Sequence, residues 1–305
     1  MANKQKLGWI GLGKMGIPMS GNLIKAGYSL TVYNLTEKET KELADQGAQV
    51  ANSPKAVGAA ADVIISMISD DPALEAVSIG PDGVFVGAKA GAIFIDMSTV
   101  SPVASARVAK GADKKGIKYL RAPVSGSTAL AAAGTLTIFA SGPKEAYDQC
   151  VDIFGAIGQK SFHVGFGEEA RYLKLVLNMM VGITSAMTAE ALTFGERGGM
   201  DWNQMIDIVN NSVVASPLVV YKAQMLKDRN YAPAFTAAQM AKDFDIALDT
   251  GRANNVPMPI TSLVRQFLGT MKAQGKGELD FFGLITLLED MAGIKASITS
   301  IDNCL

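Results

Sequence analysis

The chain is poor in the residues that most often bind transition metals or act as catalytic nucleophiles. Its 305 residues include a single histidine, His163, and two cysteines, Cys150 and Cys304, which lie far apart. We therefore expect no metal site built from nitrogen and sulfur ligands. A Ser-His-Asp hydrolase would have to use His163, and no Gly-x-Ser-x-Gly turn precedes a helix, so we interpret this histidine as structural.

An excess of charge of either sign is also missing. The 28 Lys and Arg residues balance 29 Asp and Glu residues, which removes the basic surface that nucleic-acid binding requires. The first residues lead into a strand-like segment without the apolar stretch of a signal peptide. Isolated cysteines fit a reducing compartment. We expect a cytoplasmic protein that binds neither nucleic acid nor membrane.

What is present is a globular composition, with 49% hydrophobic and 19% charged residues. The length predicts two domains, and the change of pattern near 165 divides them. We expect an α/β dinucleotide-binding domain over 1–165 and an all-α substrate and dimerisation domain over 166–305.

The first strong motif is a glycine-rich loop near the N-terminus. An apolar run over 7–10 precedes Gly11, Gly13 and Gly16, and a helical pattern follows. A Walker A loop would need a hydroxyl at position 15 to hold Mg²⁺, and Met15 has none. The spacing instead fits the dinucleotide fingerprint, in which glycines allow a tight turn and close approach to a pyrophosphate. Cofactor contacts are expected from Gly11, Leu12, Gly13, Met15 and Gly16.

The end of the next strand, 29–33, is where the adenosine ribose should bind. NAD sites usually carry Asp or Glu there, whereas this chain has Asn34. A neutral amide does not repel a 2′-phosphate, and Thr36 and Lys38 can donate hydrogen bonds to one. NADP is therefore favoured, with NAD possible. Alternatively, Asn34 and Thr36 simply begin the helix over 37–46, and both roles can hold together.

Alternating strands and helices continue to 164 and predict a doubly wound parallel sheet. The further strands are expected at 48–50, 63–67, 93–97, 118–122, 136–141 and 161–164. Ligands bind beyond the carboxyl ends of such strands, where Met67, Ile68 and Thr99 fall. The small residues Ser125, Gly126 and Ser127 can form a backbone nest for a substrate carboxylate; an ordinary tight turn is equally consistent with them.

A long helix over 171–199 joins the two halves. Lys174 and Glu190 are the only charged residues between Tyr172 and Phe194, so the helix is expected to be apolar on nearly every face and buried. Only fifteen uncharged residues separate these two charges, too few for a membrane span. Lys174 and Asn178 point the same way. A lysine that covers apolar surface with its stem is the alternative. Further helices are expected at 202–212, 218–226, 236–251, 260–273 and 281–294.

Taken together, these motifs resemble the β-hydroxyacid dehydrogenase family over essentially the whole chain. The motifs are Gly11 to Gly16 with Pro18, Met19, Ser20 and Asn22, then 96–99, 122–126, 174–178 and Lys242 with Asp243. The resemblance implies that Lys174 is the catalytic acid/base and that Asn178 positions it or the substrate. It also implies that Ser125 and Gly126 hold the carboxylate.

By the same resemblance, Thr99 and Lys242 lie at the cofactor. The motifs are most similar to the glyoxylate/succinic semialdehyde reductases, which adds Phe235 and Asp243 as substrate contacts. Two positions depart from the family: Arg121 replaces an Asp, and Leu35 replaces the Arg of NADP-using members, which weighs against NADP. The loop over 128–131 is more apolar than in glyoxylate reductases, so a less polar substrate tail is expected.

The expected activity is reversible hydride transfer between nicotinamide and a short aldehyde acid, as in an NADPH-dependent semialdehyde or glyoxylate reductase. An NAD-dependent 3-hydroxyisobutyrate-type dehydrogenase is the alternative. An imine reductase of related fold generally lacks the lysine, and loss of that lysine would also mark a non-catalytic nucleotide-binding scaffold. Because the long helix is apolar on every side, we expect a homodimer or homotetramer.

Overall fold

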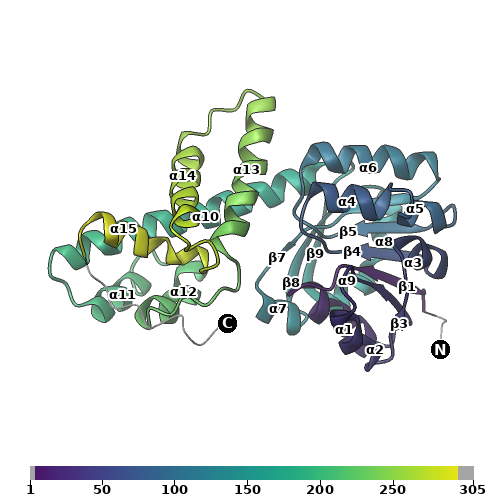
Figure 1. Ribbon diagram of the computed structural model, residues 1–305, viewed down its shortest axis with the longest axis horizontal. Helices are drawn as coiled ribbons and strands as arrows, with labels where there is room; N and C mark the ends of the chain where they lie inside the picture. Colours follow the sequence, from purple (N-terminus) through teal and green to yellow (C-terminus); the bar gives the residue numbers. More distant parts are fainter. Residues whose placement is uncertain (1–3, 295–305) are drawn as a thin grey trace. The chain divides into compact units, whose positions relative to one another are not determined.

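The computed structural model describes residues 4–294, which divide into two compact units with the division between Lys174 and Leu175. The first unit is an α/β domain and the second is helical (Figure 1). The strands are β1 (Leu7–Ile10), β2 (Leu30–Tyr33), β3 (Gln49–Val50), β4 (Val63–Ser66), β5 (Ile93–Asp96), β6 (Lys118–Arg121), β7 (Val124–Ser125), β8 (Leu136–Ser141) and β9 (Gly158–Gly165).

Within the described residues these strands form one sheet in the order β3-β2-β1-β4-β5-β6-β8-β7, with β9 paired to β8. The strands from β3 to β6 are mutually parallel, with β1 between β2 and β4. Strand β8 runs antiparallel to β6 and β7. The predicted doubly wound sheet is confirmed, and its antiparallel end carries β7 and the loop that follows it.

Alternation along the central strands builds two apolar cores, one on each face of the sheet. Trp9 and Ile95 belong to one core, whereas the adjacent residues Ile10 and Phe94 belong to the other. All four are at most 1% exposed. Burial of each such side chain contributes roughly 1.5–3 kcal/mol. Both faces are therefore covered by helices, which explains why β4 and β5 read as continuous apolar runs.

The helices of the first unit form two groups that cover opposite faces of the sheet, as Figure 1 shows for α1 and α2 against α4 and α6. They are α1 (Gly16–Lys25), α2 (Lys38–Ala44), α3 (Pro54–Ala60), α4 (Asp71–Ser78), α5 (Val84–Gly87), α6 (Pro102–Lys114), α7 (Thr128–Ala132), α8 (Lys144–Gln149) and α9 (Val151–Ile157). Side chains of Ser53, Asp70 and Ser101 cap α3, α4 and α6, each ahead of a proline in the first turn.

His163 lies on β9, with Nε2 2.9 Å from the carbonyl oxygen of Gly142. Its ring packs against Tyr147 and Phe166. These contacts fit a structural histidine.

The second unit contains α11 (Trp202–Asn210), α12 (Pro217–Lys227), α13 (Ala237–Ala253), α14 (Pro259–Ala273), the 3-10 helix η1 (Phe281–Leu284) and α15 (Ile285–Met291). The predicted helical second half is confirmed. Thr236 and Gln239 form a capping box that starts α13. The core of this unit includes Phe244, Leu268 and Phe282.

Helix α10 (Glu169–Arg197) begins in the first unit and continues in the second. Within the single chain α10 is only partly buried, so the expected burial on nearly every face is not reached there. Val176, Met180, Met187 and Phe194 are 43%, 62%, 56% and 83% exposed. By length and composition α10 could cross a bilayer, with 44% of its most apolar window buried. Its other side packs Ala186, Ala189 and Leu192 into the second core, as a core helix does.

Candidate functional site

In the glycine loop between β1 and α1, two glycines are needed by the fold and one leaves space for a ligand. Gly11 has a φ of +94°, and a Cβ there would lie 2.2 Å from the carbonyl oxygen of Met67. A Cβ on Gly16 would lie 2.0 Å from the carbonyl oxygen of Gly11. At Gly13 a Cβ would meet nothing within 4 Å. The fold itself therefore requires glycine at 11 and 16, while the space at Gly13 suits a pyrophosphate pressed against the backbone.

The end of β2 is tied to this loop by Asn34. Its Oδ1 accepts a hydrogen bond from the Leu12 backbone N–H at 3.0 Å. Its Nδ2 lies 2.9 Å from Oγ1 of Thr36 and 3.3 Å from Oε2 of Glu39, and the Thr36 hydroxyl also donates to Glu39. Asn34 and Thr36 are thus hydrogen-bonded to each other at the end of β2.

Glu39 was missed at the sequence level. The available signal was the Thr-x-x-Glu spacing from Thr36 to Glu39, because such pairs hydrogen-bond at helix starts. The hydrogen bond from Thr36 is the largest cause that lowers the pKa of Glu39, and the charge of Lys38 acts in the same direction. A carboxylate therefore stands beside the predicted ribose contacts.

The carboxyl ends of β1, β4 and β5 join into one edge. The Met67 N–H donates to the Ile10 carbonyl oxygen at 2.9 Å, and the Ile68 N–H donates to Oγ of Ser98 at 2.9 Å. Thr99 follows Ser98 and is partly buried. The predicted cofactor residues of the glycine loop, β4 and β5 consequently lie along the same edge of the sheet.

A buried ion pair links this edge to the first turn of α10. Arg171 and Asp96 are 1% and 0% exposed, and Nη2 of Arg171 donates to Oδ2 of Asp96. Arg171 also donates to the Tyr119 hydroxyl at 2.9 Å, the Ser98 carbonyl oxygen at 2.8 Å and Oγ of Ser105 at 3.3 Å. Burial alone lowers the pKa of Arg171, but Tyr119 and Asp96 raise it by more. The guanidinium is therefore charged, and each of its three nitrogens has an acceptor.

A second ion pair also holds the start of α10, but here the arginine lies on the sheet and the carboxylate lies just before the helix. Arg121 on β6 donates from Nε to Oε1 of Glu168 at 3.0 Å, and its side chain is 8% exposed. Oγ of Ser141 accepts from the Ala170 N–H at 3.2 Å and donates to the Gly167 carbonyl oxygen at 2.7 Å. The departure at position 121 therefore has a structural purpose, because it anchors the residues that open α10.

Lys174 lies three residues beyond Arg171 on α10 and is partly buried. Asn178 follows four residues later and therefore points the same way along the helix. Arg171 thus anchors the helical turn immediately before the predicted acid/base.

The stretch that begins at Ser125 is a tight turn between β7 and α7, one of the two alternatives that the sequence left open. Ser125 pairs with Thr137 across β7 and β8. Gly126 has a φ of +142°, and a Cβ there would lie 2.6 Å from a methyl carbon of Leu136, so this tight turn needs glycine. Oγ of Ser127 accepts from the Leu130 N–H at 3.5 Å and caps α7, a helix the sequence analysis did not place. These three residues stay predicted substrate contacts.

In the second unit, three predicted residues meet. Nδ2 of Asn178 donates to Oδ2 of Asp243, and Nζ of Lys242 lies 2.9 Å from Oδ1. Asp243 is 2% exposed. Phe235 is partly buried just before α13, with its ring centroid 6.3 Å from that of Phe281. Asp243 therefore fixes both the amide of Asn178 and the ammonium of Lys242.

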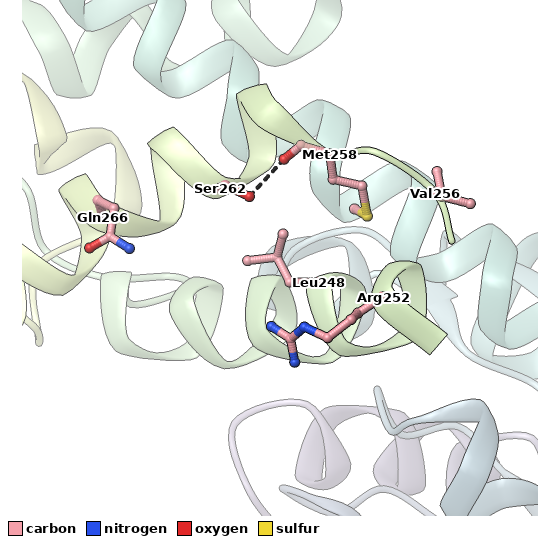
Figure 2. Close-up of a pocket in the computed structure, with 6 residues that line it drawn as sticks. All are labelled: Leu248, Arg252, Val256, Met258, Ser262 and Gln266. Atoms are coloured by element: carbon pink, nitrogen blue, oxygen red, sulfur yellow. Dashed lines mark hydrogen bonds between the residues drawn. The ribbon is translucent and has the colours of Figure 1, made fainter. Parts of the chain in front are cut away.

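A separate hollow between α13 and α14 contains none of the predicted site residues (Figure 2). Its lining consists of Leu248, Arg252, Val256, Met258, Ser262 and Gln266. Ser262 donates to the Met258 carbonyl oxygen at 2.8 Å, so one hydroxyl on its wall is already used within the helix.

Comparison with known proteins now identifies the family. Residues 6–165 match the NAD binding domain of 6-phosphogluconate dehydrogenase, and residues 169–288 match the NAD-binding domain of NADP-dependent 3-hydroxyisobutyrate dehydrogenase. The chain belongs to the β-hydroxyacid dehydrogenase family. The 2-(hydroxymethyl)glutarate dehydrogenase of Eubacterium barkeri is 35% identical over 97% of this chain and 99% of its own length.

Two further relatives agree. Glyoxylate/succinic semialdehyde reductase 1 of Arabidopsis thaliana is 32% identical over 92% of this chain and 97% of its own length. The solved 3-hydroxyisobutyrate dehydrogenase of Mycobacterium tuberculosis, with L-serine, has a TM-score of 0.86 at 26% identity and covers 94% of this chain and 99% of its own. The protein is thus an NAD(P)-dependent β-hydroxyacid dehydrogenase, as the motifs predicted.

Proposed function

We propose that this β-hydroxyacid dehydrogenase interconverts a short aldehyde acid and the corresponding hydroxyacid, with Lys174 as the acid/base. When bound, the nicotinamide supplies or accepts the hydride at the carbonyl carbon. In reduction, the Lys174 ammonium donates a proton to the carbonyl oxygen as negative charge develops there. In oxidation, the neutral amine takes the hydroxyl proton back. Such a positioned acid contributes about 10²–10⁴ in rate.

The observation that carries the proposal is the anchoring of the helical turn before Lys174. Arg171 and Asp96 bind that turn to the same strand edge that carries the glycine loop. An amine held on a rigid helix loses little freedom when it meets the carbonyl oxygen, which is how orientation lowers a barrier.

The substrate class is proposed to be a carboxylate with a short, weakly polar tail. Support comes from the names of the relatives, because glyoxylate, 2-(hydroxymethyl)glutarate and L-serine all carry a carboxyl group. The backbone N–H groups of Gly126 and Ser127, which follow the strand pairing of Ser125 with Thr137, are proposed as donors to such a group. Leu130, 44% exposed on α7, adds apolar surface near this turn.

The test is replacement of Lys174 by Ala, with Lys272→Ala on the exposed side of α14 as the matched control. We expect Lys174→Ala to lose about 10²–10⁴ in turnover while cofactor binding, measured by nucleotide fluorescence, is retained. Turnover within a few-fold of the unmodified enzyme would overturn the assignment of Lys174. Tight cofactor binding by the unmodified enzyme without turnover of any aldehyde would support the nucleotide-binding scaffold instead.

The alternative within the family is an NAD-dependent 3-hydroxyisobutyrate-type dehydrogenase. A panel of glyoxylate, succinic semialdehyde, methylmalonate semialdehyde and tartronate semialdehyde, each with NADH and NADPH, separates the two. Highest kcat/KM for methylmalonate semialdehyde would favour the alternative, because that substrate carries the extra methyl group.

We also propose that a second copy of the chain covers the exposed face of α10, giving a homodimer or homotetramer. Support comes from Val176, Met180, Met187 and Phe194, whose spacings of four, seven and seven residues place them along one side of the helix. Light scattering is expected to show an oligomer that Met187→Glu weakens. A stable monomer of the unmodified protein would contradict this proposal.

A further inference from the structure

The acidic side chain next to the predicted ribose site belongs to a different element from the one that usually carries it. In dinucleotide sites the discriminating acid normally ends the second strand. Here β2 is followed by Asn34, and the carboxylate comes from Glu39 in the first turn of α2. Glu39 therefore reaches back over five residues to the position that Asn34 occupies.

Glu39 accepts hydrogen bonds from the same donors that a 2′-phosphate would need. The Asn34 amide nitrogen and the Thr36 hydroxyl both point to Oε2 of Glu39. Oδ1 of Asn34 accepts from the Leu12 N–H, so the amide cannot flip without losing this hydrogen bond to the glycine loop. Asn34 and Thr36, the two neutral donors that favour NADP when the sequence alone is considered, are thus already hydrogen-bonded to the Glu39 carboxylate.

Lys38, the third residue that favours NADP when the sequence alone is considered, does not change this conclusion. Lys38 is exposed, and its charge helps to keep Glu39 ionised. Leu35, 89% exposed beside Asn34, adds no donor. A second anion brought to the same donors would meet the charge of Glu39, and like charges at such a distance repel. A ribose 2′-hydroxyl, in contrast, can donate a hydrogen bond to this carboxylate.

We propose that Glu39 is the residue that sets cofactor choice, and that it makes the enzyme prefer NAD(H) to NADP(H). The inference rests on the proposed function only in that the ligand is a nicotinamide dinucleotide. It reverses the preference that Asn34, Thr36 and Lys38 suggest when they are read without Glu39.

Binding measurements test this without reference to turnover. Dissociation constants for ADP and 2′,5′-ADP, and for NADH and NADPH, are measured by calorimetry for the unmodified enzyme, Glu39→Gln and Glu39→Lys. Glu37→Gln is the matched control, because it removes an exposed acid two residues away. The ratio of the two ligands on one variant cancels any general folding defect.

The unmodified enzyme is expected to bind the ligand without the 2′-phosphate at least about tenfold more tightly at low salt, and less selectively as salt screens the charge. Glu39→Gln should bring the ratio close to one, Glu39→Lys should reverse it, and Glu37→Gln should leave it unchanged. A tenfold preference of the unmodified enzyme for 2′,5′-ADP and NADPH would overturn the inference. So would a ratio that Glu39→Gln leaves within twofold of the original.

The nucleotide-binding measurements still test this inference if the proposed function is wrong. An enzyme that binds NADH through Glu39 but turns over no aldehyde acid would keep the inference and refute the reaction. An active enzyme whose nucleotide ratio ignores Glu39 would do the reverse.

Discussion

Replacement of Arg171 by Met tests the anchor of α10 most directly. The substitution keeps much of the side-chain volume but removes the charge and leaves Asp96 buried at 0% exposure without its counter-ion. Removal of one partner of a buried ion pair costs about 3–5 kcal/mol. For a unit ending at Lys174 this corresponds to a fall in Tm of roughly 6–20 °C, at about 2–4 °C per kcal/mol.

The assay uses the two tryptophans, one in each unit. Trp9 is fully buried in the first unit and donates from Nε1 to the Gly11 carbonyl oxygen at 2.9 Å. With Trp202 replaced by Phe, urea unfolding followed by fluorescence reports on the first unit. Arg171→Met should lower the midpoint without a large change in the slope, because the surface exposed on unfolding is almost the same.

The control is the double substitution Arg171→Met with Asp96→Asn. The main cost of the single change is an uncompensated charge, so removal of that charge should restore part of the stability. Oδ1 of Asp96 accepts from Ser66 and Ser98, whose hydroxyls can rotate toward an amide. A double variant no more stable than Arg171→Met would refute the reasoning.

The same variant also tests the proposed catalytic role of Lys174. At a temperature where Arg171→Met is folded, its kcat should fall. In a Lys174→Ala background the same change should have little further effect, because the group it positions is gone. Equal losses in both backgrounds would show that Arg171 acts only on stability.

Two other outcomes follow from the local geometry. Gly13→Ala should leave Tm unchanged yet weaken dinucleotide binding by about tenfold or more. Gly16→Ala should fail to fold, because its new Cβ would lie 2.0 Å from the Gly11 carbonyl oxygen. Thermal melts with and without NADH distinguish the two variants. Burial raises the pKa of Cys150 to about 12. In a Cys304→Ser background a thiol reagent at pH 8 should therefore react only after unfolding, because about one thiol in ten thousand is ionised, and rapid labelling of the folded protein would contradict this.

The sequence predicted the features that depend on local pattern. The strands β4 and β5 and the glycine loop follow from neighbouring residues, and each lies where it was expected. Helices α8 and α9 were missed because six and seven residues are too short to show a clear helical period.

Long-range charge pairs could not be predicted in the same way. Arg171 and Asp96 are 75 residues apart, and Arg121 and Glu168 are 47 apart, so no spacing rule joins them. How much of α10 the single chain covers could not be predicted either, for a different reason. Periodicity reports how apolar a helix face is, but it does not say whether the same chain covers it.

The two ion pairs at the start of α10 both oppose a change in the register of the helix. Arg121 reaches from the sheet to Glu168, while Arg171 reaches from the helix to Asp96, and Asp96 and Arg121 are paired neighbours on β5 and β6. A slip of α10 by one residue would rotate each helix partner by about 100°. Both sheet partners would then be buried and unpaired, at a cost of several kcal/mol each. Alternative positions of Lys174 along the helix axis are therefore opposed by charge as well as by apolar packing.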